Sequence, residues 1–171
     1  MRLLSIRNHL VHNVVKLVIA VALPVVVGGL SGFATARGVS TWYPTLVKPP
    51  FNPPGWVFGP VWTVLYVMMG VAAYLVWHQG IDTDGVRAGL AVFVIQLALN
   101  GLWSILFFRF HQPGWALVEI IVLWAAIGAT VWLFWRVSPA AGLLLLPYWA
   151  WVSFATVLNA SLWWLNRSTV S

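Results

Sequence analysis

The sequence predicts an all-α integral membrane protein, a bundle of five transmembrane helices that forms one domain over residues 1–171. The chain is 61% hydrophobic and only 7% charged, whereas a typical soluble domain carries about 25% charged residues. It also contains five apolar stretches of about 20 residues, the length that crosses a bilayer, separated by polar breaks. So few charges cannot cover a water-facing surface, and we therefore expect a multi-pass membrane protein. Independently of the composition, we expect its location to be a prokaryotic cell membrane.

The five helices follow the apolar stretches in order. We expect them near residues 14–36, 56–77, 88–110, 115–135 and 140–165. The first stretch follows two arginines, but it is longer than the apolar region of about 7–15 residues in a signal peptide, so we keep it as a helix of the protein. The breaks "HQGIDTDGVR", "HQPG" and "RVSPAAG" are short. Short connections predict that neighbouring helices run in alternating directions.

The charges and the missing cysteines exclude several function classes. The net charge is +6, but the nine Lys and Arg residues are scattered singly along the chain. This pattern is typical of anchors at the membrane interface and predicts no nucleic-acid partner. The chain contains no cysteine, which excludes disulfides, thiolate metal sites and cysteine nucleophiles.

A stiff segment joins the first two predicted helices. Residues 42–62 read "WYPTLVKPPFNPPGWVFGPVW". Each proline fixes its own backbone and biases the preceding residue toward an extended conformation, so we expect no helix between Trp42 and Gly55. One interpretation is a rigid turn on the lipid headgroups, with Trp42 and Tyr43 as interfacial anchors. The other is a lid over a cavity at one mouth of the bundle, because a long loop in a compact bundle is usually functional.

Four stretches carry a resemblance to a known family. "WYPTLVKPPFNPPGWVFGPVWTVLYVMMG", "QLALNGLWSILFF", "ALVEIIVLW" and "LLLPYWAWVSFATVLNASLWWLN" resemble, in this order, the signature motifs of the TspO/MBR family of tryptophan-rich sensory proteins and translocator proteins. The resemblance implies five transmembrane helices, commonly a homodimer, and a pocket under the first loop that binds tetrapyrroles such as protoporphyrin IX or haem. Transport or sensing of tetrapyrroles is the function it implies. Light-dependent porphyrin degradation and a membrane scaffold that regulates a partner are the alternatives.

The candidate ligand-binding residues form stripes on the predicted helices. Residues spaced four apart share a helix face. An aromatic stripe is more often packing between helices than a ligand pocket. The amides within these stripes favour an interior site, because they must bond either to each other or to a ligand. By spacing and by resemblance, the candidates are Trp42, Tyr43, Phe58, Trp62, Tyr66, Gln96, Asn100, Trp103, Phe107, Tyr148, Trp151 and Ala155.

Small residues on two helices predict close helix approach. Gly28 and Gly32 are four residues apart on the first predicted helix, a spacing that serves either packing within the bundle or dimerisation. On the third predicted helix, Ala91, Ala98 and Gly101 are small residues that could form a dimer face.

The sequence predicts neither a catalytic residue nor a metal ligand. Glu119 is the one carboxylate within a predicted span, where a charge costs about 2.5–3.5 kcal/mol, so a structural or a proton-linked role is open. All four histidines lie outside the predicted spans. Because haem iron usually takes His, Cys, Met or Tyr, we expect metal-free porphyrin, or haem held by its face and edges. Arg37 and Lys48 flank the loop and suit the propionates, or serve as interface anchors.

Overall fold

The computed structural model describes residues 2–167, with side chains from Leu10 onward, and confirms the predicted fold class. Within this range the chain is helical and contains no strand. Five of its helices are long and apolar enough to cross a membrane. The elements are α1 (Arg2–Thr41), the short 3-10 helix η1 (Tyr43–Thr45), α2 (Gly55–His78), α3 (Val86–Ser104), the π-helical turn η2 (Ile105–Arg109), α4 (Pro113–Val137) and α5 (Pro139–Asn166).

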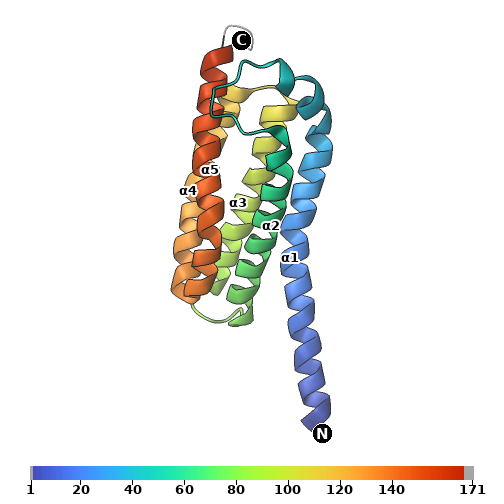
Figure 1. Cartoon of the computed structure of the whole chain (residues 1–171). Helices are drawn as coiled ribbons and strands as arrows, with labels where there is room; N and C mark the ends of the chain where they lie inside the picture. The colour runs from blue at the N-terminus through green and yellow to red at the C-terminus, as the bar shows by residue number, and fades with distance from the viewer. Residues whose placement is uncertain (1, 168–171) are drawn as a thin grey trace.

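The bounds of α2, α4 and α5 lie within two residues of the prediction, and α3 together with η2 covers the third predicted helix. Helix α1 is much longer than expected. We predicted a helix near residues 14–36, and α1 extends over Arg2–Thr41. Hydropathy detects only the part of a helix that matches the bilayer core, whereas the helix continues until the backbone is interrupted. At 1.5 Å per residue, α1 is about 60 Å long, about twice the hydrocarbon thickness. Figure 1 shows its N-terminal part extending beyond the other four helices.

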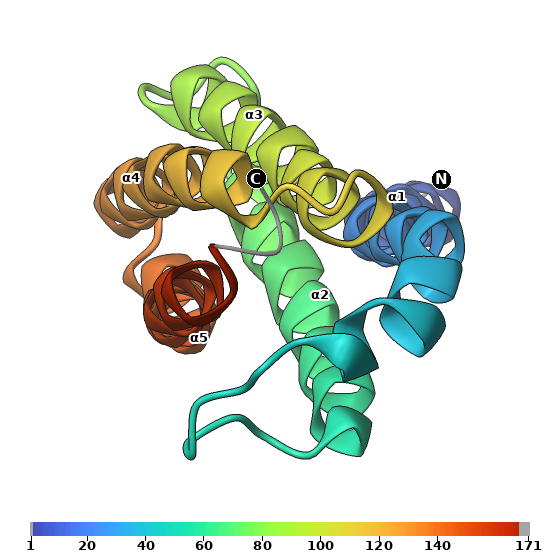
Figure 2. The ribbon, with the colours of Figure 1, turned by 90° about the horizontal axis from the view of Figure 1, so that it is seen from above.

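Helix α2 is the central helix of the bundle, and the other four helices are arranged around it. Contacts join α1 to α2, α2 to α5, α5 to α4 and α4 to α3, and α2 touches each of the other four helices. Seen from above, α2 crosses the middle of the molecule, and the α1–α2 loop reaches from α1 toward α5 (Figure 2). The N-terminal end of α1 and the C-terminal end of α5 lie at opposite ends of the molecule (Figure 1).

The interior is packed in two regions. The larger core fills the half of the bundle away from the α1–α2 loop and includes Met69, Phe93, Ile120 and Ile127. A smaller cluster lies under the loop and contains Leu46, Phe107, Ala116, Leu158 and Leu162. The space between α1 and α2 lies beside these clusters and forms the candidate site described below.

Two glycines bring α1 against its neighbours. A Cβ on Gly70 of α2 would overlap the backbone of Ala20 and Val21 on α1, and a Cβ on Gly38 of α1 would overlap the backbone of Phe108 in η2. Such close approach of helix backbones is the usual role of small residues in membranes. Helix α1 is therefore attached at a lower point on α2 and at an upper point on η2.

Two of the five small residues that we considered for dimerisation pack inside the bundle, whereas Gly32, Ala91 and Ala98 are exposed. Gly28 lies against the ring of Tyr66, and Gly101 lies against the hydroxyl of Ser31. Both contacts are within the chain, and Gly101 is buried, so of the three residues proposed for a dimer face only Ala91 and Ala98 are exposed for one. The homodimer itself stays a prediction.

The proline-rich loop contains one helical turn that we did not expect. Residues Tyr43–Thr45 form the 3-10 helix η1, with Pro44 in its first turn. Proline is tolerated there because the first N–H groups of a helix have no partner within it. The rest of the segment up to Gly55 is not helical, as predicted.

Five spans place the two termini on opposite sides of the membrane. Tags fused to each end, in vesicles of uniform orientation, should therefore show opposite accessibility to an added protease. Digestion of both tags from the same side would contradict the five-span fold.

The close contact at Gly70 predicts a difference between two glycine substitutions. Gly70→Ala should lower the free energy of unfolding by about 1–3 kcal/mol, because the added methyl forces α1 and α2 apart. Gly59→Ala is the matched control on the same helix: a Cβ there meets nothing within 4 Å, and alanine is the better helix former. Thermal unfolding in detergent should show a lower Tm for the first variant and an equal or higher Tm for the second.

Candidate functional site

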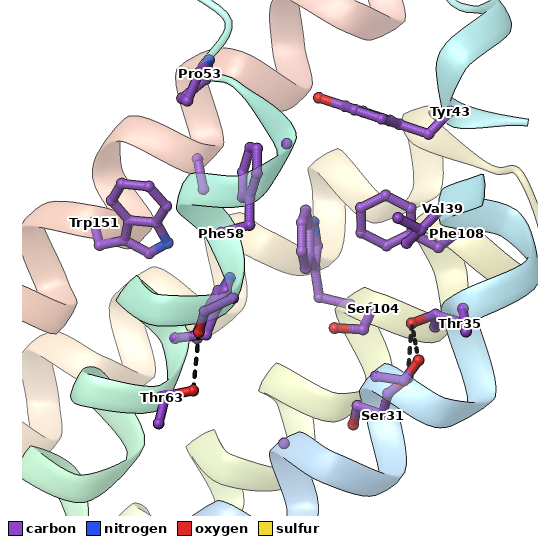
Figure 3. A pocket seen from close by; sticks show the side chains of 18 of the residues that line it. Ser31, Thr35, Val39, Tyr43, Pro53, Phe58, Thr63, Ser104, Phe108 and Trp151 are labelled. Atoms are coloured by element: carbon purple, nitrogen blue, oxygen red, sulfur yellow. Dashed lines mark hydrogen bonds between the residues drawn. The ribbon is translucent and has the colours of Figure 1, made fainter.

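The candidate site is a cavity of about 1120 Å³ beneath the α1–α2 loop. Its walls come from α1, α2, the end of α3 with η2, and α5, and the loop forms its roof. Figure 3 shows side chains of α1 and α2 facing each other across this space, with Tyr43 above it. Typical ligand pockets measure about 300–1,000 Å³, so this cavity is large enough for an extended ligand.

Seven of the twelve candidate residues line the cavity. They come from the loop and from α2, α3 and α5, segments that are far apart in the sequence. They are Tyr43, Phe58, Trp62, Tyr66, Trp103, Trp151 and Ala155. The stripe predicted on α2 by its four-residue spacing therefore faces the cavity along its whole length.

The lining rings are held by contacts with one another. Trp62 stacks on Tyr66 with centroids 5.4 Å apart and an interplanar angle of 28°. Phe58 meets Trp151 edge-to-face at 6.0 Å, which joins the α2 wall to the α5 wall. Trp62, Phe58 and Trp151 are half-buried, so each keeps part of its surface available to a ligand.

Three other candidates lie under the cavity floor, in a chain of hydrogen bonds. The Tyr66 hydroxyl donates to Asn100 Oδ1 at 2.7 Å, Asn100 Nδ2 donates to the Tyr148 hydroxyl at 3.1 Å, and that hydroxyl donates to Gln96 Oε1 at 2.9 Å. The four side chains are buried and connect α2, α3 and α5. Of the two roles left open for the amides, the structure shows bonding between helices, and it places Gln96, Asn100 and Tyr148 outside the cavity lining.

Trp42 and Phe107, the last two candidates, pack in the cluster under the loop. Trp42 stacks on His111 at 4.4 Å and meets Phe107 edge-to-face at 5.6 Å. Phe107 is 1% exposed. These contacts attach the start of the loop to the α3–α4 connection, and neither residue lines the cavity.

The π-helical turn explains why Phe108, and not Phe107, lines the cavity beside Trp103. A spacing of four residues keeps two side chains on one face of an α-helix, which was our reason for choosing Phe107. In η2 the hydrogen bonds span five residues, as from Phe110 N to Ile105 O at 3.0 Å, and this shifts the face by one residue. No pattern in the sequence announces this change of period.

Sequence reasoning also missed the wall that α1 provides. Ser31 and Thr35 line the cavity, and the Thr35 hydroxyl donates to the Ser31 carbonyl at 2.7 Å. Gly29 and Gly32 line it as well. The available signal was a pair of hydroxyl residues four positions apart within an apolar span, which is weak because such side chains commonly bond to their own helix.

The loop lines the cavity, which favours the lid interpretation over a simple interfacial turn. The Tyr43 hydroxyl donates to Asn52 Oδ1 at 2.7 Å across the loop, and burial raises the pKa of Tyr43 above its ordinary value, so the hydroxyl keeps its proton. Lys48 Nζ donates to the carbonyls of Pro44 at 3.1 Å and Leu46 at 3.0 Å. These bonds hold the loop in one shape.

A side chain of α5 clamps the loop from below. Val47 N donates to Asn166 Oδ1 at 2.9 Å, and Asn166 Nδ2 donates to the Val47 carbonyl at 2.9 Å. One amide side chain thus satisfies both backbone groups of Val47, as a neighbouring β-strand would. The clamp joins the middle of the loop to the last turn of α5.

The charged and metal-ligating residues contribute little to the cavity. Glu119 is buried on α4, and neither carboxylate oxygen has a hydrogen-bond partner among the described residues; it does not line the cavity. No group of three His, Cys, Asp or Glu side chains in residues 10–167 is placed to hold a metal ion. Of the two cations considered for propionates, Lys48 lines the cavity and Arg37 does not.

The fold and the site together define a class: a multi-pass membrane protein with an aromatic-walled pocket inside the bundle, roofed by its first loop. Comparison with known sequences then identifies the family. The sequence profile of the TspO/MBR family matches residues 20–165, and the chain belongs to this family.

Individual relatives come from distant organisms. The chain is 43% identical over 154 residues to the tryptophan-rich protein TspO of Archaeoglobus fulgidus, covering 90% of this chain and 99% of that protein. It is 44% identical over 134 residues to the human translocator protein, covering 78% and 79%. It is 40% identical over 125 residues to the tryptophan-rich sensory protein of Cereibacter sphaeroides, covering 73% and 77%.

The clamp predicts that Asn166→Leu loosens the loop without unfolding the bundle. The bond from Asn166 to Leu162 of its own helix is lost as well, but the two bonds to Val47, of about 0.5–1.5 kcal/mol each, are the ones that hold the loop. Exchange of the Val47 amide hydrogen should therefore accelerate about fivefold or more. Hydrogen exchange of residues 42–55, compared with residues 78–87, measures this. Ser161→Ala is the control, because the Ser161 hydroxyl bonds only to Val157 of its own helix. Unchanged exchange at Val47 in the Asn166 variant would show that the clamp does not hold the loop.

Proposed function

We propose that this protein binds a planar tetrapyrrole in the cavity beneath the α1–α2 loop and takes part in the sensing or transport of tetrapyrroles. The observation that carries the proposal is the cavity itself, large and walled by aromatic rings from α2, α3 and α5. Family membership supports it, since relatives bear the names translocator protein and tryptophan-rich sensory protein.

The wall chemistry suits a flat conjugated ring. Trp62, Trp103 and Trp151 line the same space from three helices, and each offers an extended π surface. Aromatic pairs gain about 0.5–1.5 kcal/mol beyond the area that they bury. A tetrapyrrole ring is wide enough to meet several of these side chains at once, and contact with several rings gives it an advantage over a smaller or more flexible apolar ligand.

Lys48 supplies a cation for the acidic edge of the ligand. An ammonium group has three donors, and two of them bond to loop carbonyls, which leaves one for a propionate. The ammonium also lies 5.1 Å from the centroid of the Tyr43 ring, so its position at the roof is fixed. The ring of the ligand would then lie deeper, against α2 and α5, with its acidic edge toward the loop.

The donor set of the cavity favours contact through the ligand's face and edges. The described lining residues include no His, Cys or Met, three of the side chains that usually ligate haem iron. Two tyrosines line the cavity, and each hydroxyl already donates a hydrogen bond, from Tyr43 to Asn52 and from Tyr66 to Asn100. This supports metal-free protoporphyrin IX, or haem held without an axial ligand from the protein.

The alternative functions, the homodimer and the prokaryotic location stay predictions. Light-dependent porphyrin degradation would use the same cavity, and a scaffold role would not need it. Assembly as a homodimer and residence in a prokaryotic cell membrane likewise stay predictions, and the relatives include both prokaryotic and animal proteins.

The proposal predicts that Trp62 carries part of the affinity. Trp62→Ala should weaken binding of protoporphyrin IX about three- to tenfold, because one ring contact of about 0.5–1.5 kcal/mol is lost. Trp62→Phe should weaken it less, because a smaller ring remains. Quenching of tryptophan fluorescence during titration of the protein in detergent or nanodiscs measures the Kd.

The control for this experiment is Trp135→Ala. Trp135 lies on α4 outside the cavity and is 46% exposed, so its loss should leave the Kd unchanged. Helical content by circular dichroism confirms that each variant is folded. Parent-like binding by folded Trp62→Ala would show that the tetrapyrrole does not rest on α2, and no binding by the parent protein would overturn the proposed function.

A further inference from the structure

The cavity has a side opening between α1 and α2, at the level of the membrane. Several of the residues that line the cavity from these two helices are exposed. They are Val25, Gly29, Gly32, Ala36 and Val39 on α1, and Gly59 and Thr63 on α2. Figure 3 shows the two helices side by side, with Thr63 on the α2 side and Ser31, Thr35 and Val39 on the α1 side. Because both helices are membrane spans, this opening faces lipid.

The opening follows from how α1 is attached. Below it, Gly70 brings the backbones of α1 and α2 together, and the ring of Tyr66 covers Gly28. Above it, Gly38 holds α1 against η2, which lies on the far side of the cavity from α2. Between Gly28 and Gly38, α1 is therefore turned toward η2 and away from α2.

No side chains fill the space that results. Gly29 and Gly32 on α1 and Gly59 on α2 line the cavity, and a Cβ added at any of the three would meet no atom within 4 Å. This contrasts with Gly28, Gly38 and Gly70, where a Cβ would overlap a neighbouring residue. The first three glycines thus border open space, whereas the other three are required by close packing.

The water-facing side of the cavity is closed more firmly than this flank. The loop is stiffened by five prolines, bonded across itself from Tyr43 to Asn52 and clamped to α5 through Val47 and Asn166. Movement of a ligand through the roof requires these bonds to break. Movement through the flank requires only the displacement of lipid chains.

We propose that the opening bordered by Gly29, Gly32, Gly59 and Thr63, the α1–α2 gap, is a portal through which ligands pass between the bilayer and the cavity. The inference rests on the proposed function and adds to it the physical class of the ligand: flat, largely apolar molecules that are dissolved in the membrane. The ring enters edge-on between the two helices, and its polar edge stays toward the loop and Lys48.

A thiol inside the gap tests the route without any tetrapyrrole. The natural chain has no cysteine, so Ser31→Cys introduces a single thiol on the inner side of the gap, at a residue that is 8% exposed. The full-length variant in liposomes is treated either with pyrene maleimide, which dissolves in the bilayer, or with a sulfonated maleimide, which stays in water on both sides of the membrane. We expect labelling by the bilayer reagent and at least tenfold slower labelling by the aqueous one.

Substitutions that narrow the gap sharpen the test. Gly32→Leu combined with Gly59→Leu places side chains in the open space and should slow pyrene maleimide labelling of Ser31→Cys about tenfold. Each single substitution should also slow this labelling, by a smaller factor. The single variants replace the double variant in the test if the double variant folds poorly. Leu30→Cys is the control, because Leu30 is on the same helix, is 65% exposed and does not line the cavity. Its labelling should be unaffected by the leucine substitutions.

Three outcomes would overturn the portal. They are faster labelling of Ser31→Cys by the aqueous reagent, equal labelling with and without the leucine substitutions, and no labelling by pyrene maleimide while Leu30→Cys reacts. The last would mean that the gap is covered, by a second copy of the chain or by closure of α1 on α2. Because no porphyrin is used, failure here is distinct from failure of the proposed function, which the Trp62 titration decides.

Discussion

The hydrogen-bonded chain from Tyr66 through Asn100 and Tyr148 to Gln96 joins three helices where no water competes. In hydrocarbon a polar group must find a partner inside the protein, so these side chains hold α2, α3 and α5 in a fixed arrangement. The chain begins at the cavity floor, since Tyr66 lines the cavity while its hydroxyl donates into the interior. The position of the stacked Trp62 and Tyr66 rings therefore depends on a buried network that no ligand needs to touch.

Helix α1 lies outside this network. It is held instead by two close backbone contacts, at Gly70 below and at Gly38 above, and the space between these contacts is left to the cavity. The loop after α1 is fixed separately, by prolines and by the clamp between Val47 and Asn166. The same attachment of α1 thus explains both a site that is closed toward water and a flank that is open toward lipid.

The tryptophans of the chain, thirteen in all, include members of both classes that their chemistry allows, ligand-facing and surface-exposed. Trp62, Trp103 and Trp151 line the cavity, whereas Trp56 and Trp115 are more than two-thirds exposed, at 76% and 68%. The indole ring suits both a flat ligand and a membrane interface because it is apolar with one polar edge. Position in the tertiary structure, rather than residue type, decides which tryptophans line the cavity and which lie on the outer surface.

The sequence by itself determined the five membrane spans, their order and the stripe of Phe58, Trp62 and Tyr66, because hydropathy and the period of an α-helix are local properties. Only the tertiary structure decided which of Trp42 and Tyr43 faces the cavity, because adjacent side chains in a turn point in different directions. It also decided that Phe108 replaces Phe107 in the lining, since the π-helical turn shifts the face by one residue. The α1 wall and the partners of Gln96 and Asn100 were equally undetermined, because a helical pattern tells which residues share a face but not which helix that face meets.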